Sequence, residues 1–353
     1  MHYNCTIIVA HYYFLSQLST SANQNNLGQE ENFMKKTLTF LAVLAMLGHL
    51  GAQTVQAQKG SGQNLQGTIT MSGAFALYPM VMKWSEEFRK LYPQVRFDIS
   101  AGGAGKGIAD ALADMVDIGM VSREIHPVEI QKGAWFIPVT KDAVVAVINQ
   151  GNPLLKELLK KGMKKADFMR IWLDETPPTW NELAATKGNL QIHVYTRSDS
   201  CGAAETWALF LGKKQEDLLG IGVFGDPGLN EAVRKDALGI GFNNINYAYD
   251  ATTRKPMAGV TILPIDLNEN GRIDTDENFY SHRDAIVKAI ADDKYPSPPA
   301  RDLYFVCHGR PQKQLLAVFM KWVLSTGQKF VTEAGYIALS AAKLTQGLRK
   351  IGQ

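Results

Sequence analysis

Along most of the chain, the spacing of hydrophobic and polar residues alternates between the short period of strands and the longer period of helices. Residues 68–71 and 95–99 are expected to form strands, and the segment 79–91 between them carries apolar residues at helical spacing. The apolar run 144–148 is typical of a buried strand in a parallel sheet. An amphipathic segment at 315–323 predicts a last helix. This alternation predicts an α/β fold.

Two stretches of the chain, residues 138–143 and 296–304, are expected to cross between two lobes. On this interpretation lobe 1 comprises residues 66–140 and 303–353, and lobe 2 comprises residues 141–302. Each lobe is expected to hold a mostly parallel sheet flanked by helices, with the two crossings as a two-strand hinge.

The N-terminal part of the chain contains the three parts of a secretory signal peptide. Met34-Lys-Lys36 precedes the apolar run 38–47, and small residues lead to a cleavage point after Ala57. We therefore predict a signal peptide over residues 34–57 and interpret residues 1–33 as an over-extended start. The mature protein is expected to be periplasmic or otherwise extracytoplasmic, and not to span a membrane.

Composition narrows the classes of function. Of the 353 residues, 46% are hydrophobic and 20% are charged, with a net charge of +3, which fits a soluble globular protein. Lysines and arginines are scattered, so nucleic-acid binding is not expected. Cys201 and Cys307 are the cysteines that follow the predicted cleavage point, too few for a disulfide framework.

Four segments share one plan, in which a strand ends in a turn of small residues before a helix: residues 72–76, 101–107, 121–124 and 197–206. In an open α/β sheet such turns gather at the carboxyl ends of the strands, where ligands bind. The first N–H groups of a helix lack internal partners and carry the positive end of its dipole. Several helix N-termini converging on one cleft therefore predict an anion site that needs no metal.

The turn from Arg197 to Ala203 adds a permanent charge to this prediction. Arg197 provides a planar fork of donors that matches paired oxygen atoms. Asp199, two residues on, is placed to orient that fork. We expect Arg197 to form one wall of the anion cleft.

With these four turns, the chain resembles the periplasmic phosphate-binding proteins of ABC transporters, which belong to the type II periplasmic binding protein superfamily. The resemblance covers nearly all of the mature chain, and its most specific part is the family pattern Arg-x-Asp-x-Ser-Gly-Thr. The matching stretches are Gly73-Ala-Phe75 before Lys83-Trp84, Gly103-Ala-Gly105, Gly119-Met-Val-Ser122, Arg197-Ser-Asp-Ser-Cys-Gly-Ala203, Ala237–Phe242 and Trp322–Phe330.

This resemblance implies a two-lobed periplasmic-binding-protein-like fold that closes on inorganic phosphate or a related tetrahedral oxyanion. It implies delivery of that anion to an ABC transporter permease and its ATPase, and a protein that is a monomer, has no organic cofactor and is not an enzyme. The ligand-binding residues that it implies are Ala74, Phe75, Ala76, Gly103, Ala104, Gly105, Ser122, Arg197, Asp199, Cys201, Gly202 and Ala203.

The chain departs from the family pattern at several of these positions. Where the family places hydroxyl groups, this chain has Phe75, Ala104, Cys201 and Ala203. Backbone N–H groups remain at these positions, but each hydrogen bond lost to a charged ligand is worth about 1.5–3 kcal/mol. Ser122 both donates and accepts hydrogen bonds, so it does not restrict the ligand to hydrogen phosphate. Sulfate, molybdate and larger phosphorylated ligands stay open.

A second segment, residues 266–277, matches the twelve-residue calcium loop at every constrained position. Gly271 allows the sharp turn, and Ile273 packs inward. Residues 260–265 look like a strand, so the helix that precedes a true EF-hand is absent. We predict a structural Ca²⁺ that staples the loop, with oxygen ligands from Asp266, Asn268, Asn270, Arg272, Asp274 and Glu277.

Two alternatives remain open from the residues alone. Cys201, at a helix N-terminus near Arg197, is placed to act as the nucleophile of a cysteine-dependent phosphatase. The other alternative is a calcium-stabilised secreted module whose ligand site is vestigial or altered.

Overall fold

The computed structural model describes residues 65–352. The predicted signal peptide at 34–57 and the predicted start at 1–33 lie outside these residues. The strands are β1 (Gly67–Gly73), β2 (Val95–Ala101), β3 (Ile118–Val121), β4 (Ala134–Asn149), β5 (His193–Arg197), β6 (Ile221–Val223), β7 (Gly239–Asn244), β8 (Val260–Ile262) and β9 (Ala300–His308).

Helices alternate with these strands, as the hydrophobic pattern predicts. The α-helices are α3 (Tyr78–Leu91), α4 (Ala104–Leu112), α5 (Pro127–Gln131), α6 (Leu155–Lys161), α7 (Lys165–Leu173), α8 (Trp180–Leu183), α9 (Gly202–Phe210), α10 (Gly225–Lys235), α11 (Ile245–Ala248), α12 (Arg283–Ala291), α13 (Gln314–Val323) and α14 (Ala341–Gly352). Between residues 65 and 352 the short 3₁₀ helices are η1 (Phe75–Leu77), η2 (Gln215–Asp217) and η3 (Thr326–Phe330).

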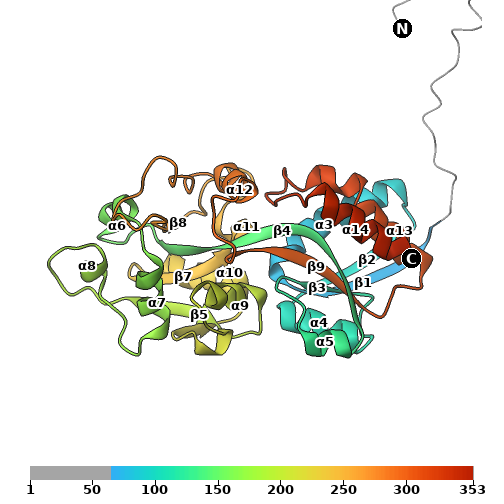
Figure 1. Cartoon of the computed structure of the whole chain (residues 1–353), viewed down its shortest axis with the longest axis horizontal. Coiled ribbons are helices and arrows are strands. Elements are labelled where there is room, and N and C mark those ends of the chain that lie inside the picture. The colour runs from blue at the N-terminus through green and yellow to red at the C-terminus, as the bar shows by residue number, and fades with distance from the viewer. Residues whose placement is uncertain (1–64, 353) are drawn as a thin grey trace, which may run out of the picture. The chain divides into compact units, whose positions relative to one another are not determined.

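The strands follow the order β2-β1-β3-β9-β4-β7-β5-β6, and β8 pairs with β4. Strand β1 pairs in parallel with β2 and β3, and β5 pairs in parallel with β6 and β7. The long strands β4 and β9 join these two groups and run between the two lobes in Figure 1. The predicted α/β class and two-lobed arrangement are confirmed.

Strand β4 corrects one expectation about pairing. Its residues 143–148 are buried, as predicted for the apolar run 144–148. However, β4 runs antiparallel to β7, β8 and β9 rather than lying in a parallel sheet. An apolar run reports burial on both faces and carries no information on strand direction.

Two hydrophobic cores lie on either side of this crossing. One core takes its residues from 65–139 and 303–351. The other takes its residues from 143–300, together with Ile337. In the second core the rings of Trp207 and Phe242 stack with their centroids 5.9 Å apart.

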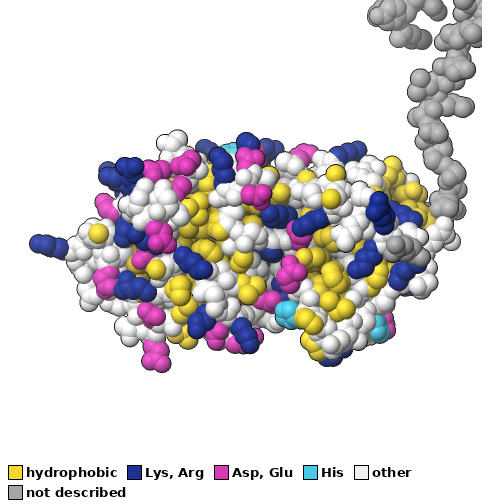
Figure 2. Space-filling view, in the orientation of Figure 1, with side chains coloured by type: hydrophobic (Ala, Val, Ile, Leu, Met, Phe, Trp, Pro, Cys, Tyr) yellow, Lys and Arg dark blue, Asp and Glu magenta, His cyan; other side chains and the backbone are white. Residues whose placement is uncertain are grey.

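The surface carries no large area of one charge on the face drawn in Figure 2, where Lys and Arg side chains are interspersed with Asp and Glu. Between residues 65 and 352, none of the helices has the length and apolar character that a membrane span requires.

The two crossing strands carry a buried pair of opposite charges. Asp142 of β4 faces Arg301 of β9 in the strand register, and their closest charged atoms are 3.7 Å apart. The Asp142 side chain has no exposed surface. Burial raises the pKa of Asp142 from 3.8 to about 7, although Arg301 acts to lower it.

This shift predicts a pH dependence of stability. Between about pH 4 and pH 7 the folded protein holds a proton on Asp142 that the unfolded chain releases. The free energy of unfolding should therefore fall as pH rises through this window, by up to about 1.4 kcal/mol per pH unit. Urea denaturation at several pH values should show that Asp142→Asn removes this slope. The control Asp174→Asn, at an exposed position, should keep it. Equal slopes in wild type and Asp142→Asn would contradict the assignment.

Candidate functional site

The four predicted turns meet in the structure at the ends of β1, β2, β3 and β5. The N–H groups of Gly102 and Gly103 donate to the carbonyl of Gly73, at 2.8 and 3.1 Å. The N–H of Gly105 donates to the carbonyl of Ser200 at 3.1 Å. These bonds bring the turns after β1 and β2 against the turn after β5, so the two lobes touch at the place where the sequence predicts an anion site.

Two glycines permit this close approach. Gly103 has a φ of 89°, and a Cβ there would lie 2.7 Å from the carbonyl oxygen of Ser200. A Cβ on Gly202 would overlap the carbonyl oxygen of Ser122. Ser122, which follows β3, thus lies directly against the first turn of α9.

Arg197, the last residue of β5, lies at the centre of this region with its side chain fully buried. Its Nε and Nη2 donate to the two carboxylate oxygens of Asp199, at 2.8 and 2.6 Å. This bidentate pair fixes the plane of the guanidinium, which is the role that the sequence suggested for Asp199.

A second carboxylate, which no local sequence pattern marks, also binds Arg197. Nη1 of Arg197 donates to Oδ2 of Asp226 at 2.6 Å. Burial acts to lower the pKa of Arg197, but the charges of Asp226 and Asp199 hold it above its usual value. The guanidinium therefore stays charged although no solvent reaches it.

Asp226 belongs to a longer buried network. Asn244, the last residue of β7, donates its backbone N–H to Oδ1 of Asp226 at 3.2 Å and its side-chain amide to the same oxygen. Arg301 donates Nη2 to the side-chain oxygen of Asn244 and Nε to the carbonyl of Ser122 at 3.2 Å. The network runs from the crossing strands to Arg197. No sequence signal marked these residues, because each is distant in the chain from its partner.

Several backbone donors that the resemblance assigned to the ligand are used within the protein. The backbone N–H of Ala74 donates to the carbonyl of Met120, and the backbone N–H of Cys201 donates to the side-chain oxygen of Gln215. The N–H groups of Gly103 and Gly105 are likewise bonded to carbonyl groups of neighbouring turns. Backbone donors without a partner in their own helix remain in the first turns of η1, α4 and α9. These belong to Phe75, Ala76, Ala104, Gly202 and Ala203.

An aromatic cluster lies over Arg197 at the position where the resemblance leads us to expect a hydroxyl side chain. The ring of Phe75 lies 5.6 Å from the guanidinium carbon of Arg197, a distance typical of a cation–π contact. Phe224, which is 60% exposed, lies edge-on to Phe75 at 6.0 Å. The hydroxyl of Tyr247 donates to the carbonyl of Phe75 at 3.2 Å. Phe75 therefore links the two lobes across the arginine.

Cys201 is the N-cap of α9 and is buried at the edge of the second hydrophobic core. The residue is 5% exposed, and its Sγ accepts a hydrogen bond from the N–H of Ala204 at 3.4 Å. Burial raises the pKa of Cys201 to about 12, although Arg197 acts to lower it. The thiol is therefore protonated at neutral pH and does not have the character of an activated nucleophile. Cys307 is buried and free as well.

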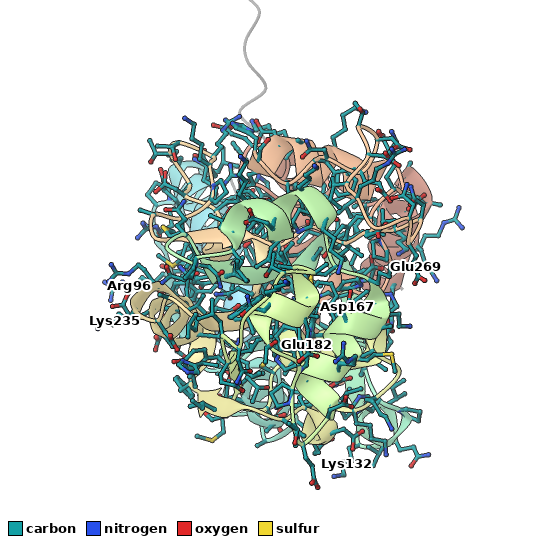
Figure 3. All side chains as sticks on the ribbon, turned by 90° about the vertical axis from the view of Figure 1, so that its left-hand side faces the viewer. Arg96, Lys132, Asp167, Glu182, Lys235 and Glu269 are labelled. Carbon is teal, nitrogen blue, oxygen red and sulfur yellow. The ribbon has the colours of Figure 1, made fainter. Side chains whose placement is uncertain are left out.

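The predicted calcium loop folds around its own acidic side chains. Both oxygens of Asp266 accept backbone N–H groups, from Asn270 at 3.2 Å and from Gly271 at 2.7 Å. Oε1 of Glu277 accepts the N–H of Asn268 at 3.0 Å, and the side-chain amides of Asn268 and Asn270 donate to Asp274. Gly271 has a φ of 81°. Glu269 of this loop lies at the edge of the molecule in Figure 3.

Comparison with known proteins identifies the family. The PBP superfamily domain matches residues 57–326, so the chain belongs to this superfamily. It is 24% identical over 324 residues to the phosphate-binding protein PstS of Pseudomonas aeruginosa, covering 84% of this chain and 90% of that protein. It is also 24% identical to the protein SphX of Synechococcus elongatus, over 90% of both chains.

A solved structure shows the same fold. An ABC-type phosphate transport receptor from Vibrio cholerae superposes with a TM-score of 0.56 at 18% identity, covering 77% of this chain and all of that one. The resemblance to the phosphate-binding proteins of ABC transporters is thereby confirmed.

The burial of Cys201 predicts slow thiol chemistry. In a Cys5→Ser, Cys307→Ser variant, the remaining Cys201 should react with a thiol reagent at pH 8 far more slowly than the same variant unfolded in urea, because its thiolate is disfavoured and covered. Absorbance of the released chromophore measures the rate. Labelling of the folded protein as fast as in urea would contradict this description and would support Cys201 as a nucleophile.

Proposed function

We propose that this protein is an extracytoplasmic solute-binding protein that captures phosphate, or a related tetrahedral oxyanion, between its two lobes and delivers it to an ABC permease with its ATPase. The observation that carries the proposal is Arg197, a buried permanent charge at the point where turns from both lobes meet. Two of the similar proteins support this choice of ligand, since one is named a phosphate-binding protein and the other an ABC-type phosphate transport receptor.

The donors for such an anion come from both lobes. Phe75, Ala76 and Ala104 offer first-turn N–H groups from lobe 1, and Gly202 and Ala203 offer them from lobe 2. An oxyanion that accepts bonds from both sets holds the lobes together. Capture by closure requires this division of donors, because a ligand bound by one lobe alone gives no reason to close.

We infer binding rather than catalysis for this site. The thiol of Cys201 is buried, and neither a phosphatase nor a vestigial module finds support among the relatives. The proposal includes a signal peptide over residues 34–57, because delivery to a membrane permease requires export of the binding protein. It also includes a monomeric protein.

The proposal predicts that Arg197 is needed for affinity. Calorimetric titration with phosphate, sulfate and molybdate should give heat with at least one anion for the wild type. Arg197→Gln should weaken that binding about ten- to hundred-fold, because a charged hydrogen bond is lost. The matched control Arg234→Gln changes an arginine whose side chain is 46% exposed, and it should bind as the wild type does.

Two results would count against this proposal. Absence of heat with all three anions would exclude an oxyanion-binding function. Equal affinities for Arg197→Gln and Arg234→Gln would place the anion elsewhere in the protein.

We further propose that residues 266–277 bind a structural Ca²⁺. Asp266 and Glu277 are 2% and 4% exposed, and within residues 65–352 neither has a lysine or arginine within ion-pair distance. Two buried carboxylates without a counter-charge favour a cation. The described residues gather no cluster of three His, Cys, Asp or Glu side chains around one point. A calcium ion would therefore also need oxygens from the remaining residues of the proposed set.

Calcium binding should raise the melting temperature. Scanning fluorimetry with millimolar Ca²⁺ and with EDTA should show a higher melting temperature in calcium for the wild type, because the ion binds the folded loop alone. Glu277→Gln should abolish the difference. Glu269→Gln changes the same residue type in the same loop, outside the proposed ligand set, and should keep it. A wild-type melting temperature that does not change with calcium would refute the proposal that residues 266–277 bind a structural Ca²⁺.

A further inference from the structure

The guanidinium of Arg197 already donates hydrogen bonds to two carboxylates of the protein itself, those of Asp199 and Asp226. Asp199 takes Nε and Nη2, and Asp226 takes Nη1. The side chains of all three residues are buried, with exposed fractions of 0%, 7% and 1%. One positive and two negative charges leave this group with a net charge of −1. An external anion that approaches Arg197 therefore meets a centre whose charge is more than neutralised.

The two carboxylates make different contacts with the guanidinium. Asp199 is two residues from Arg197 and holds it by two parallel bonds, the geometry that orients a guanidinium. Asp226 comes from the first turn of α10 and makes a single, end-on bond. An oxyanion bound end-on to the same nitrogen would make the same kind of bond.

Asp226 is also held firmly in this position. Its other oxygen accepts two N–H groups of Asn244, and its carbonyl accepts the side-chain amide of Asn243 at 2.9 Å. Gly225, directly before it, has a φ of 72°, and a Cβ there would lie 3.0 Å from the ring of Phe75. The backbone that presents Asp226 is thus packed against the cover of the site.

We infer that Asp226 is an internal carboxylate ligand of Arg197, which competes with the external oxyanion for the guanidinium and lowers the affinity of the site. The inference rests on the proposed function, since it assumes that the oxyanion binds at Arg197. A fixed negative charge a few ångströms from the ligand repels every anion, whatever its protonation state. Asp226 is then a residue that sets affinity, while Asp199 is one that positions Arg197.

Replacing each aspartate by asparagine separates these roles. Calorimetric titration of the full-length protein with phosphate and with sulfate at one pH should show that Asp226→Asn binds both anions at least about ten-fold more tightly than the wild type. Asp199→Asn removes the same charge but also the bidentate clamp, so it should bind more weakly. Asp174→Asn, at an exposed position, should match the wild type.

The outcomes distinguish this inference from the proposed function. If the wild type binds phosphate and Asp226→Asn binds it equally or more weakly, the inference is overturned and the proposed function stands. Tighter sulfate with weaker phosphate would mean that Asp226 accepts a proton from the ligand, which also overturns it. If neither protein binds either anion, the proposed function fails and the inference with it. Should Asp226→Asn not unfold cooperatively on heating, Asp226→Ser carries the same prediction.

Discussion

A buried guanidinium that never loses its charge is the constraint on which the cleft depends. Arg197 has no exposed side-chain surface, and an uncompensated charge in such a place would be strongly destabilising. Asp199 and Asp226 provide the compensation, Asn244 holds Asp226, and Arg301 holds Asn244. Arg301 in turn faces Asp142 across the two crossing strands. Compensation of one charge therefore organises the polar interior from the cleft to the hinge.

Much of the architecture follows from the sequence, because the periodicity of apolar residues reports burial and the small-residue turns mark strand ends. The four turns, and Asp199 beside Arg197, were predicted because each lies within a short segment. Asp226 and Arg301 were not predicted, because their partners come from other strands and helices. The antiparallel direction of β4 was missed for a related reason, since direction depends on the chain between strands. Contacts between residues that are distant in the sequence are not marked by any short sequence pattern.

The departures from the family pattern acquire a physical meaning in the structure. Phe75, in a position where a hydroxyl was expected, covers Arg197 and touches Phe224 of the other lobe. Backbone groups of Ala74 and Gly105 are engaged in joining the turns. Fewer backbone N–H groups of these turns are thus left for a ligand, and Phe75 adds a contact between the lobes. The calcium-type loop is a separate feature, built from local sequence, and its geometry is independent of the cleft.

The central claim, that an oxyanion binds at Arg197 between the lobes, is tested most directly by a crystal structure of the protein grown with saturating phosphate. The account predicts tetrahedral density within hydrogen-bond distance of the Arg197 guanidinium and of first-turn N–H groups from both lobes. Tetrahedral density at some other place, with Arg197 still contacted only by Asp199 and Asp226, would contradict it.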